Sequence, residues 1–151
     1  MYCTLADIEK LLPEETIIQL TDDENLSPTA IDPTDETHTA IIGRIDEAIA
    51  AADATIDSYC QGRYTVPLSP VPAKIKLLSV DIGIYNLYSR RDMAMPEIRG
   101  DRNKEAIRFL EKVADGKVQL GASTPAPVDA PSSADSAADT RIFTRDKMQG
   151  F

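Results

Sequence analysis

The chain has 151 residues, enough for one domain with a hydrophobic core and too few for a second domain of ordinary size. Apolar residues make up 42% and aromatic residues 5%, without tryptophan, so the core must come mainly from Ile, Leu, Val and Ala, as in packed helices rather than an all-β domain. The formal net charge of −9 lies in residues 1–40, where ten acids face one base, which disfavours general binding to nucleic acid or anionic membranes.

The N-terminal segments read as two short helices and a loop. Thr4, followed by Asp7 and then by aliphatic residues to Leu12, is typical of an N-cap with an acidic first turn. Pro13 ends this helix and begins a second one over "PEETIIQL". The acidic stretch from Thr21 to Thr37 contains two prolines and no apolar period, so we expect a surface loop.

A pair of long helices follows the loop. Apolar side chains recur at steps of three and four from Ile41 to Tyr59, which predicts a helix of about twenty residues ending at Gly62. After a proline-rich segment, the apolar stripe from Ile75 to Ser89, widened by Leu77, Ile84 and Tyr88, is broad enough to contact other helices on two sides. These two helices are therefore expected to form the centre of the fold.

A shorter, more charged outer helix completes the expected body, with Asp101 as its cap and Gly116 as its stop. The predicted fold is all-α: a small bundle of about four to five helices with a long central helix pair, an acidic loop and an extended C-terminal tail. Composition divides the chain into a helical domain over 1–120, a flexible Pro/Ala/Ser linker over 121–140 and a docking segment over 141–151.

The docking segment combines apolar and basic residues. Its apolar side chains are Ile142, Phe143, Met148 and Phe151. An apolar segment at the end of a tether is typical of a docking peptide, and a frayed tail has the same composition. Both interpretations stay open.

The sequence offers no coherent catalytic set. His38 is the only histidine, so Ser-His, Cys-His and multi-histidine metal chemistry all lack parts. The loop acids from Asp22 to Glu36 do not follow the calcium-loop pattern, which favours a solvated loop. Cys3 and Cys60 are far apart, without a metal-ligand spacing or a signal peptide, and are interpreted as reduced thiols in a cytosolic compartment. We expect no enzyme, no cofactor, no metal and no membrane span.

Two groups of polar residues remain as candidates for binding. The first is a basic cluster after the central helices: Arg90, Arg91, Arg99, Arg102, Lys104 and Arg108. It could face DNA phosphates or acidic protein. Because interleaved aromatic residues and a helix-turn-helix pattern are missing, the acidic front of an identical neighbour is the favoured partner.

The second group lies in the joint between the two long helices and consists of Asp57, Arg63, Tyr64, Pro67 and Pro72. A polar site and a structural joint are both compatible with these residues. In the favoured, structural interpretation, Asp57 and Arg63 pair across the helix end, Tyr64 covers the edge of the core, and the prolines fix the direction of the turn.

Several of these segments together resemble a known family. "IDSYCQGRYTVPL", Pro72, the helix "LLSVDIGIYNLYSRR" and "RNKEAIRFLEKVADGKVQLG" are similar to the small helical proteins of Mu-like bacteriophages associated with the head-to-tail junction. The opening "YCTLADIEKLLPEETIIQLTDDE" and the ending "FTRDKMQGF" are similar as well, and the likeness spans residues 2–121. Cys60 and Gly83 depart from the pattern, because a larger apolar residue and an alanine are expected there.

The resemblance implies a structural head-tail connector, or adaptor, in the virion neck. It would form a ring of about twelve copies on the portal vertex. The implied partners are other copies of the chain, the portal protein and a tail or head-completion protein. Packaged DNA would pass through the ring, and assembly would take place in the host cytoplasm. The alternative is a cytosolic helical regulatory protein that binds nucleic acid or a protein partner through Arg90–Arg108.

Overall fold

The computed structural model describes residues 1–91 and 93–121 of the chain. This part contains five α-helices and a short 3-10 turn and has no strand, so the predicted all-α fold is confirmed. The helices are α1 (Leu5–Glu9), α2 (Glu14–Thr21), α3 (Thr39–Cys60), α4 (Ala73–Ser89) and α5 (Glu97–Ala114), with the turn η1 (Glu36–His38) before α3. The predicted linker and docking segment, except Gly121, lie outside the described residues.

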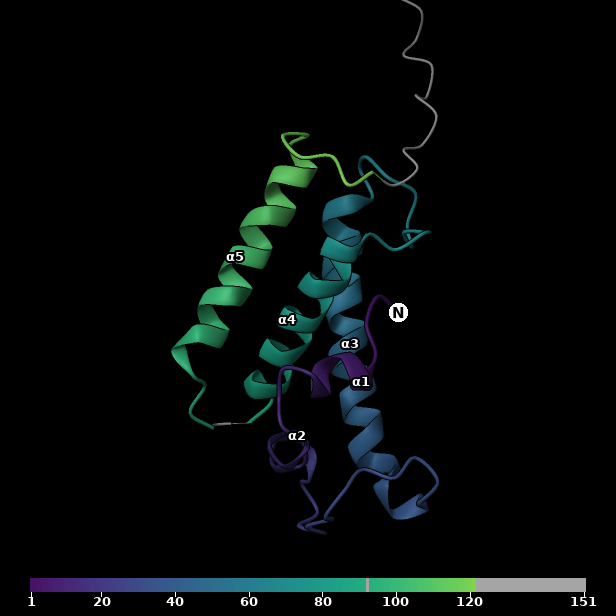
Figure 1. The fold of residues 1–151 in the computed structure, drawn as a ribbon, viewed down its shortest axis with the longest axis vertical. Coiled ribbons are helices and arrows are strands. Elements are labelled where there is room, and N and C mark those ends of the chain that lie inside the picture. Colours follow the sequence, from purple (N-terminus) through teal and green to yellow (C-terminus); the bar gives the residue numbers. More distant parts are fainter. Residues whose placement is uncertain (92, 122–151) are drawn as a thin grey trace, which may run out of the picture.

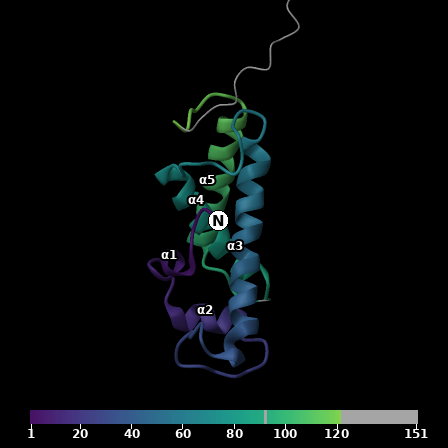
Figure 2. The ribbon, with the colours of Figure 1, turned by 90° about the vertical axis from the view of Figure 1, so that its right-hand side faces the viewer.

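The long central pair consists of α3 and α4, as predicted. The two helices run in opposite directions, and α5 returns alongside them (Figure 1). The short helices α1 and α2 pack on the same pair, with α2 and the acidic loop at the end where α3 begins (Figures 1 and 2). The segment that follows α5 lies at the opposite end of the bundle (Figure 1).

Two groups of buried side chains fill the bundle. One joins α1 and α2 to the first half of α3 and the second half of α4, and includes Ile8, Ile17, Ile45 and Ile84. The other joins the second half of α3 to the start of α4 and to α5, and includes Ile56, Ile75 and Leu110. Full burial of such an aliphatic side chain contributes roughly 1.5–3 kcal/mol, so these contacts hold the five helices together. Leu77 is 55% exposed, which makes the contact surface of α4 narrower than predicted.

The N-terminal helices begin as predicted. The Asp7 carboxylate accepts hydrogen bonds from Thr4 N at 3.2 Å and from Thr4 Oγ1 at 3.0 Å, which stabilises the first turn of α1. Pro13 is the N-cap of α2, and the two glutamates that follow it lie where the helix dipole favours negative charge. The loop after α2 leads to η1 and then to α3.

The start of α5 differs from the prediction. The helix begins at Glu97, directly after Pro96, and Asp101 lies a full turn inside it. Pro96 occupies the N-cap position without a side-chain hydrogen bond, and Glu97 supplies the negative charge of the first turn. Asp101 instead pairs with Lys104 at 3.1 Å. Gly116, with a φ of +77°, follows the end of the helix as expected.

Candidate partner-binding surface

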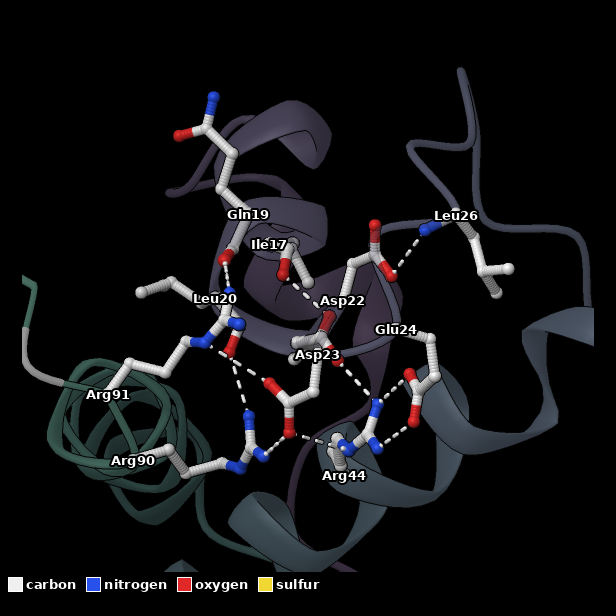
Figure 3. Close-up of polar contacts among 11 residues, drawn as sticks. Ile17, Gln19, Leu20, Asp22, Asp23, Glu24, Leu26, Arg44, Arg90 and Arg91 are labelled. Atoms are coloured by element: carbon white, nitrogen blue, oxygen red, sulfur yellow. Dashed lines mark hydrogen bonds and ion pairs between the residues drawn. The ribbon is translucent and has the colours of Figure 1, made fainter.

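Three arginines, one on α3 and two directly after α4, converge on Asp23, just after α2 (Figure 3). Arg90 Nη2 lies 2.6 Å and Arg44 Nε 3.2 Å from Asp23 Oδ2. Arg91 Nε lies 3.2 Å from Asp23 Oδ1. Arg44 also binds Glu24, with Nη1 2.6 Å from Oε2 and a second contact through Nη2. We call these five residues the Asp23 cluster.

The same arginines cap the C-terminal end of α2. The last carbonyl groups of an α-helix have no partner within the helix, and they carry the negative end of its dipole. Three consecutive carbonyl oxygens each accept a 2.8 Å hydrogen bond from a different arginine: Gln19 from Arg91, Leu20 from Arg90 and Thr21 from Arg44 (Figure 3). The guanidinium groups therefore fasten α2 to α3 and α4.

The acids at this end of the loop are held in their ionised form. The hydrogen bond from Arg90 lowers the pKa of Asp23 below its ordinary value, with help from the charges of the other arginines. The pKa of Glu24 is lowered chiefly by the hydrogen bond from Arg44. Backbone N–H groups of the loop, first that of Ser27, lower the pKa of Asp22. The cluster is therefore fully charged near neutral pH.

The acidic segment and the arginines meet within a single chain. Sequence reasoning assigned Arg90 and Arg91 to the acidic front of a neighbour, and the structure pairs both with the acidic front of their own chain. Both guanidinium groups are already bound to Asp23 before any partner arrives. A direct role for these two residues in partner contact stays a prediction.

The other predicted bases lie along α5. Arg99 donates to the carbonyl oxygen of Leu11 and so ties the start of α5 to the link between α1 and α2. Arg102 Nη1 lies 3.5 Å from Asp81 Oδ1 on α4, and its side chain is 43% exposed. Arg108 is exposed and forms no ion pair with the residues that the structure describes. Arg102 and Arg108 are thus the arginines of the predicted cluster that α5 exposes to solvent.

The joint between α3 and α4 is organised by Tyr2 rather than by an ion pair. The buried Tyr2 hydroxyl donates to Asp57 Oδ1 and accepts a 2.9 Å hydrogen bond from Leu68 N. Burial, followed by the hydrogen bond to Asp57, raises the pKa of Tyr2 above its ordinary value. The N-terminal segment is therefore a structural part of the joint.

The predicted Asp57–Arg63 ion pair is wrong, because Arg63 lies elsewhere. A Cβ atom placed on Gly116 would come within 2.3 Å of Arg63 Nη1, so the guanidinium covers that glycine after α5. Tyr64 is buried at the edge of the core, as expected, and its hydroxyl accepts a 3.0 Å hydrogen bond from Leu120 N. Pro67 lies in the same loop, and Pro72 is the N-cap of α4. These contacts tie the joint to the segment that follows α5, and its purely structural role stays a prediction.

Comparison with known proteins identifies the family. Residues 2–138 match the family described as Bacteriophage Mu, Gp36. The chain belongs to this family. It is 44% identical over 80 residues to the Mu-like prophage FluMu protein gp36 of Haemophilus influenzae, a match that covers 53% of this chain and 55% of the relative. It is 29% identical over 108 residues to gene product J of Escherichia phage Mu, covering 70% of this chain and 74% of the relative.

The remaining candidates for chemistry in this Gp36-family chain are buried side chains. His38 is buried, and its Nδ1 accepts a 3.0 Å hydrogen bond from Asp32 N, which closes the acidic loop. Cys3 and Cys60 are buried free thiols, and burial raises the pKa of Cys60 to about 11. Over residues 1–91 and 93–121, no three His, Cys, Asp or Glu residues gather to hold a metal ion, and no helix is both long and apolar enough to cross a membrane.

Two contributors were missed by sequence reasoning. Arg44 lies in α3, which was interpreted only through its apolar stripe. The signal for its role was its place in the sequence, because it is the first arginine after the ten acids of residues 1–40, and it binds one of them, Glu24. Tyr2 gave no local signal, since its partners Asp57 and Leu68 lie far along the chain. The predicted tail residues Ile142, Phe143, Met148 and Phe151 lie outside the described residues.

Proposed function

We propose that this Gp36-family chain is a structural protein of the phage neck, a head-tail connector. It would form a ring of about twelve copies on the portal vertex, complete the head and receive the tail. The observation that carries the proposal is the family match over residues 2–138, together with the likeness of the joint and α4 to proteins of the head-to-tail junction. It would act by contact, without turnover and without a cofactor.

A ring requires two different surfaces on each copy that fit one another. One candidate is the exposed side of α5 with Arg102 and Arg108. The other is the part of the acidic loop beyond the Asp23 cluster, where Asp32, Asp35 and Glu36 are exposed and bind no lysine or arginine among the described residues. Opposite charge on these surfaces supports head-to-tail contact between neighbours.

Charge reversal on α5 tests this contact without disturbing the Asp23 cluster. Arg108→Glu should weaken ring formation by the purified full chain, and most strongly at low salt, because exposed charges attract over about a Debye length. Its thermal unfolding should match that of the wild type, since the side chain is exposed and unpaired among the described residues. Lys117→Glu, an equal reversal beyond α5 at an exposed lysine that pairs with Asp115, is the control for the change in net charge. Unchanged ring size by mass photometry would remove α5 from the interface.

The neck assignment is tested in cells that produce the particle. A tagged copy of the chain should recover portal and head proteins, and electron microscopy of the eluate should show rings or necks. Recovery of nucleic acid or host proteins alone would favour the regulatory alternative. That alternative has less support because Arg90 and Arg91 already bind Asp23 and leave fewer charges for phosphate groups.

A further inference from the structure

A cleft of about 720 Å³ opens beside α2, at the end of the bundle where the acidic loop lies. Its apolar lining comes from Ile18 on α2, Pro28 in the loop and Met93 after α4. The carboxylate-bearing residues Glu15 and Asp22 also line it. This volume falls within the roughly 300–1,000 Å³ of protein pockets that bind small ligands.

The charge of the cleft favours a basic occupant. Arg91 reaches the lining, but its guanidinium is held by Asp23 and by the carbonyl oxygen of Gln19. The carboxylate of Asp22 accepts hydrogen bonds from Leu26 N at 3.0 Å and Ser27 N at 2.8 Å, so it is fixed in place and ionised. An apolar anchor with bases on either side would complement this cleft.

The chain itself contains such a segment. Only three phenylalanines occur in 151 residues, and two of them lie in the last nine. Phe143 has Arg141 and Arg145 two residues away on either side, whereas the nearest base to Phe151 is Lys147. Phe143 therefore complements the cleft better than Phe151 does, because its ring lies between two positive charges in the sequence.

The tether is long enough for this segment to reach the cleft. Gly121 and Arg141 are twenty positions apart in the sequence, and an extended chain spans at most about 3.3–3.6 Å per residue, or roughly 65–70 Å. The segment after α5 and helix α2, which lines the cleft, lie at opposite ends of the bundle, whose long axis follows α3 (Figures 1 and 2). The 22 residues of α3 span about 33 Å at 1.5 Å per residue. A cleft on the same chain or on an adjacent copy is therefore within reach.

We propose that this cleft is the docking site for residues 141–151 of this chain, with Phe143 as the anchor. The phenyl ring contacts Ile18 and Met93, and the flanking arginines face Glu15 and Asp22. The docking site does not depend on the proposed ring, because the segment can reach the cleft of its own chain as well as that of an adjacent copy.

Photo-cross-linking of the full chain tests the proposal. With p-benzoylphenylalanine at position 143, irradiation should give cross-links to residues 15–29 or to Met93, identified by mass spectrometry. The same amino acid at position 131, in the linker, is the control and should give few such products. Mixing isotopically heavy and light copies reports whether the segment comes from the same chain or from a neighbour. Either source supports the site, and only a neighbour's segment also supports contact between copies.

Charge variants supply the second readout. Glu15→Lys should lower the cross-link yield about threefold to fivefold, as expected when an exposed ion pair is lost. Glu15→Gln should lower it less, and Glu47→Lys, a reversal on the exposed side of α3, should leave it unchanged. Urea midpoints of the variants verify that each is folded. Cross-links that avoid the cleft, or a yield insensitive to both Glu15 variants, would overturn the assignment whether or not the chain forms rings.

Discussion

Removal of one oxygen atom, by Tyr2→Phe, should measurably destabilise the chain. The Tyr2 ring is buried, and the substituted ring has almost the same shape, so packing is preserved. The hydroxyl is lost, and with it the donation to Asp57 and the acceptance of the 2.9 Å hydrogen bond from Leu68 N. The substitution therefore isolates the polar part of the joint.

The expected cost follows from the two broken hydrogen bonds. A hydrogen bond to a charged group contributes roughly 1.5–3 kcal/mol, and a buried donor left without a partner costs roughly 1–3 kcal/mol. Asp57 is partly exposed, so water replaces much of its lost bond, whereas the hydrogen bond to Leu68 N is buried. We expect a net loss of about 2 kcal/mol, or roughly 4–8 °C in Tm for a chain of this size.

Urea unfolding followed by far-UV circular dichroism measures this loss as a lower midpoint with an unchanged slope. Tyr85→Phe is the matched control, because the Tyr85 hydroxyl has no hydrogen bond within the described residues and its removal should change stability by less than about 0.5 kcal/mol. Equal midpoints for the two variants would refute the role assigned to the Tyr2 hydroxyl.

The same residue predicts a dependence on alkaline pH. Because the pKa of Tyr2 is higher in the folded than in the unfolded chain, its contribution is complete below about pH 10 and is lost as the pH rises further. In urea unfolding measured across this pH range, the Tyr2→Phe variant should therefore lose less stability at alkaline pH than the wild type.

Three further predictions concern stability. Gly83→Ala should stabilise the chain by up to about 1 kcal/mol in thermal unfolding, because its Cβ would lie 3.7 Å from Ile8 in ordinary contact and alanine is the better helix former. Gly116→Ala should destabilise it, since the φ of +77° is strained for alanine and the Cβ would clash with Arg63; an equal shift for both variants would contradict the geometry. Acid titration should lower stability as the pH falls from about 4, because ion pairs hold the pKa of Asp7 and Asp23 below that of the unfolded chain, and Asp7→Asn should flatten this dependence.

Local patterns predicted the helices well and their ends less well. The apolar period of α3 and α4 reaches over many turns, so each helix and its buried side could be inferred from the sequence. The start of α5 was misplaced, because both Asp101 and Pro96 are plausible first-turn residues and only packing decides between them. One packing contact at this start is the hydrogen bond from Arg99 to the carbonyl oxygen of Leu11. Leu11 lies 88 residues away in the sequence, so the sequence could not predict this contact.

Polar contacts over long sequence distances were the least predictable. Asp57 and Arg63 were expected to pair because they are close in sequence, and Asp57 instead binds Tyr2, 55 residues away. The carbonyl groups capped by the Asp23 cluster carry no side-chain signal at all, so only the structure identifies them. Such contacts depend on which helices lie side by side, which apolar periodicity alone does not specify.

The Asp23 cluster also limits what net charge can predict about assembly. Ten acids against one base in residues 1–40 indicate a negative surface ready for a positive partner. Three arginines from the rest of the chain already bind Asp23 or Glu24, so part of that charge stabilises the fold. Arg91→Glu would place a carboxylate against Asp23 and release the Gln19 carbonyl, and a failed ring would then reflect a loosened α2. Arg108 lies outside the Asp23 cluster and is unpaired among the described residues. Arg108→Glu can therefore weaken ring assembly without weakening the fold.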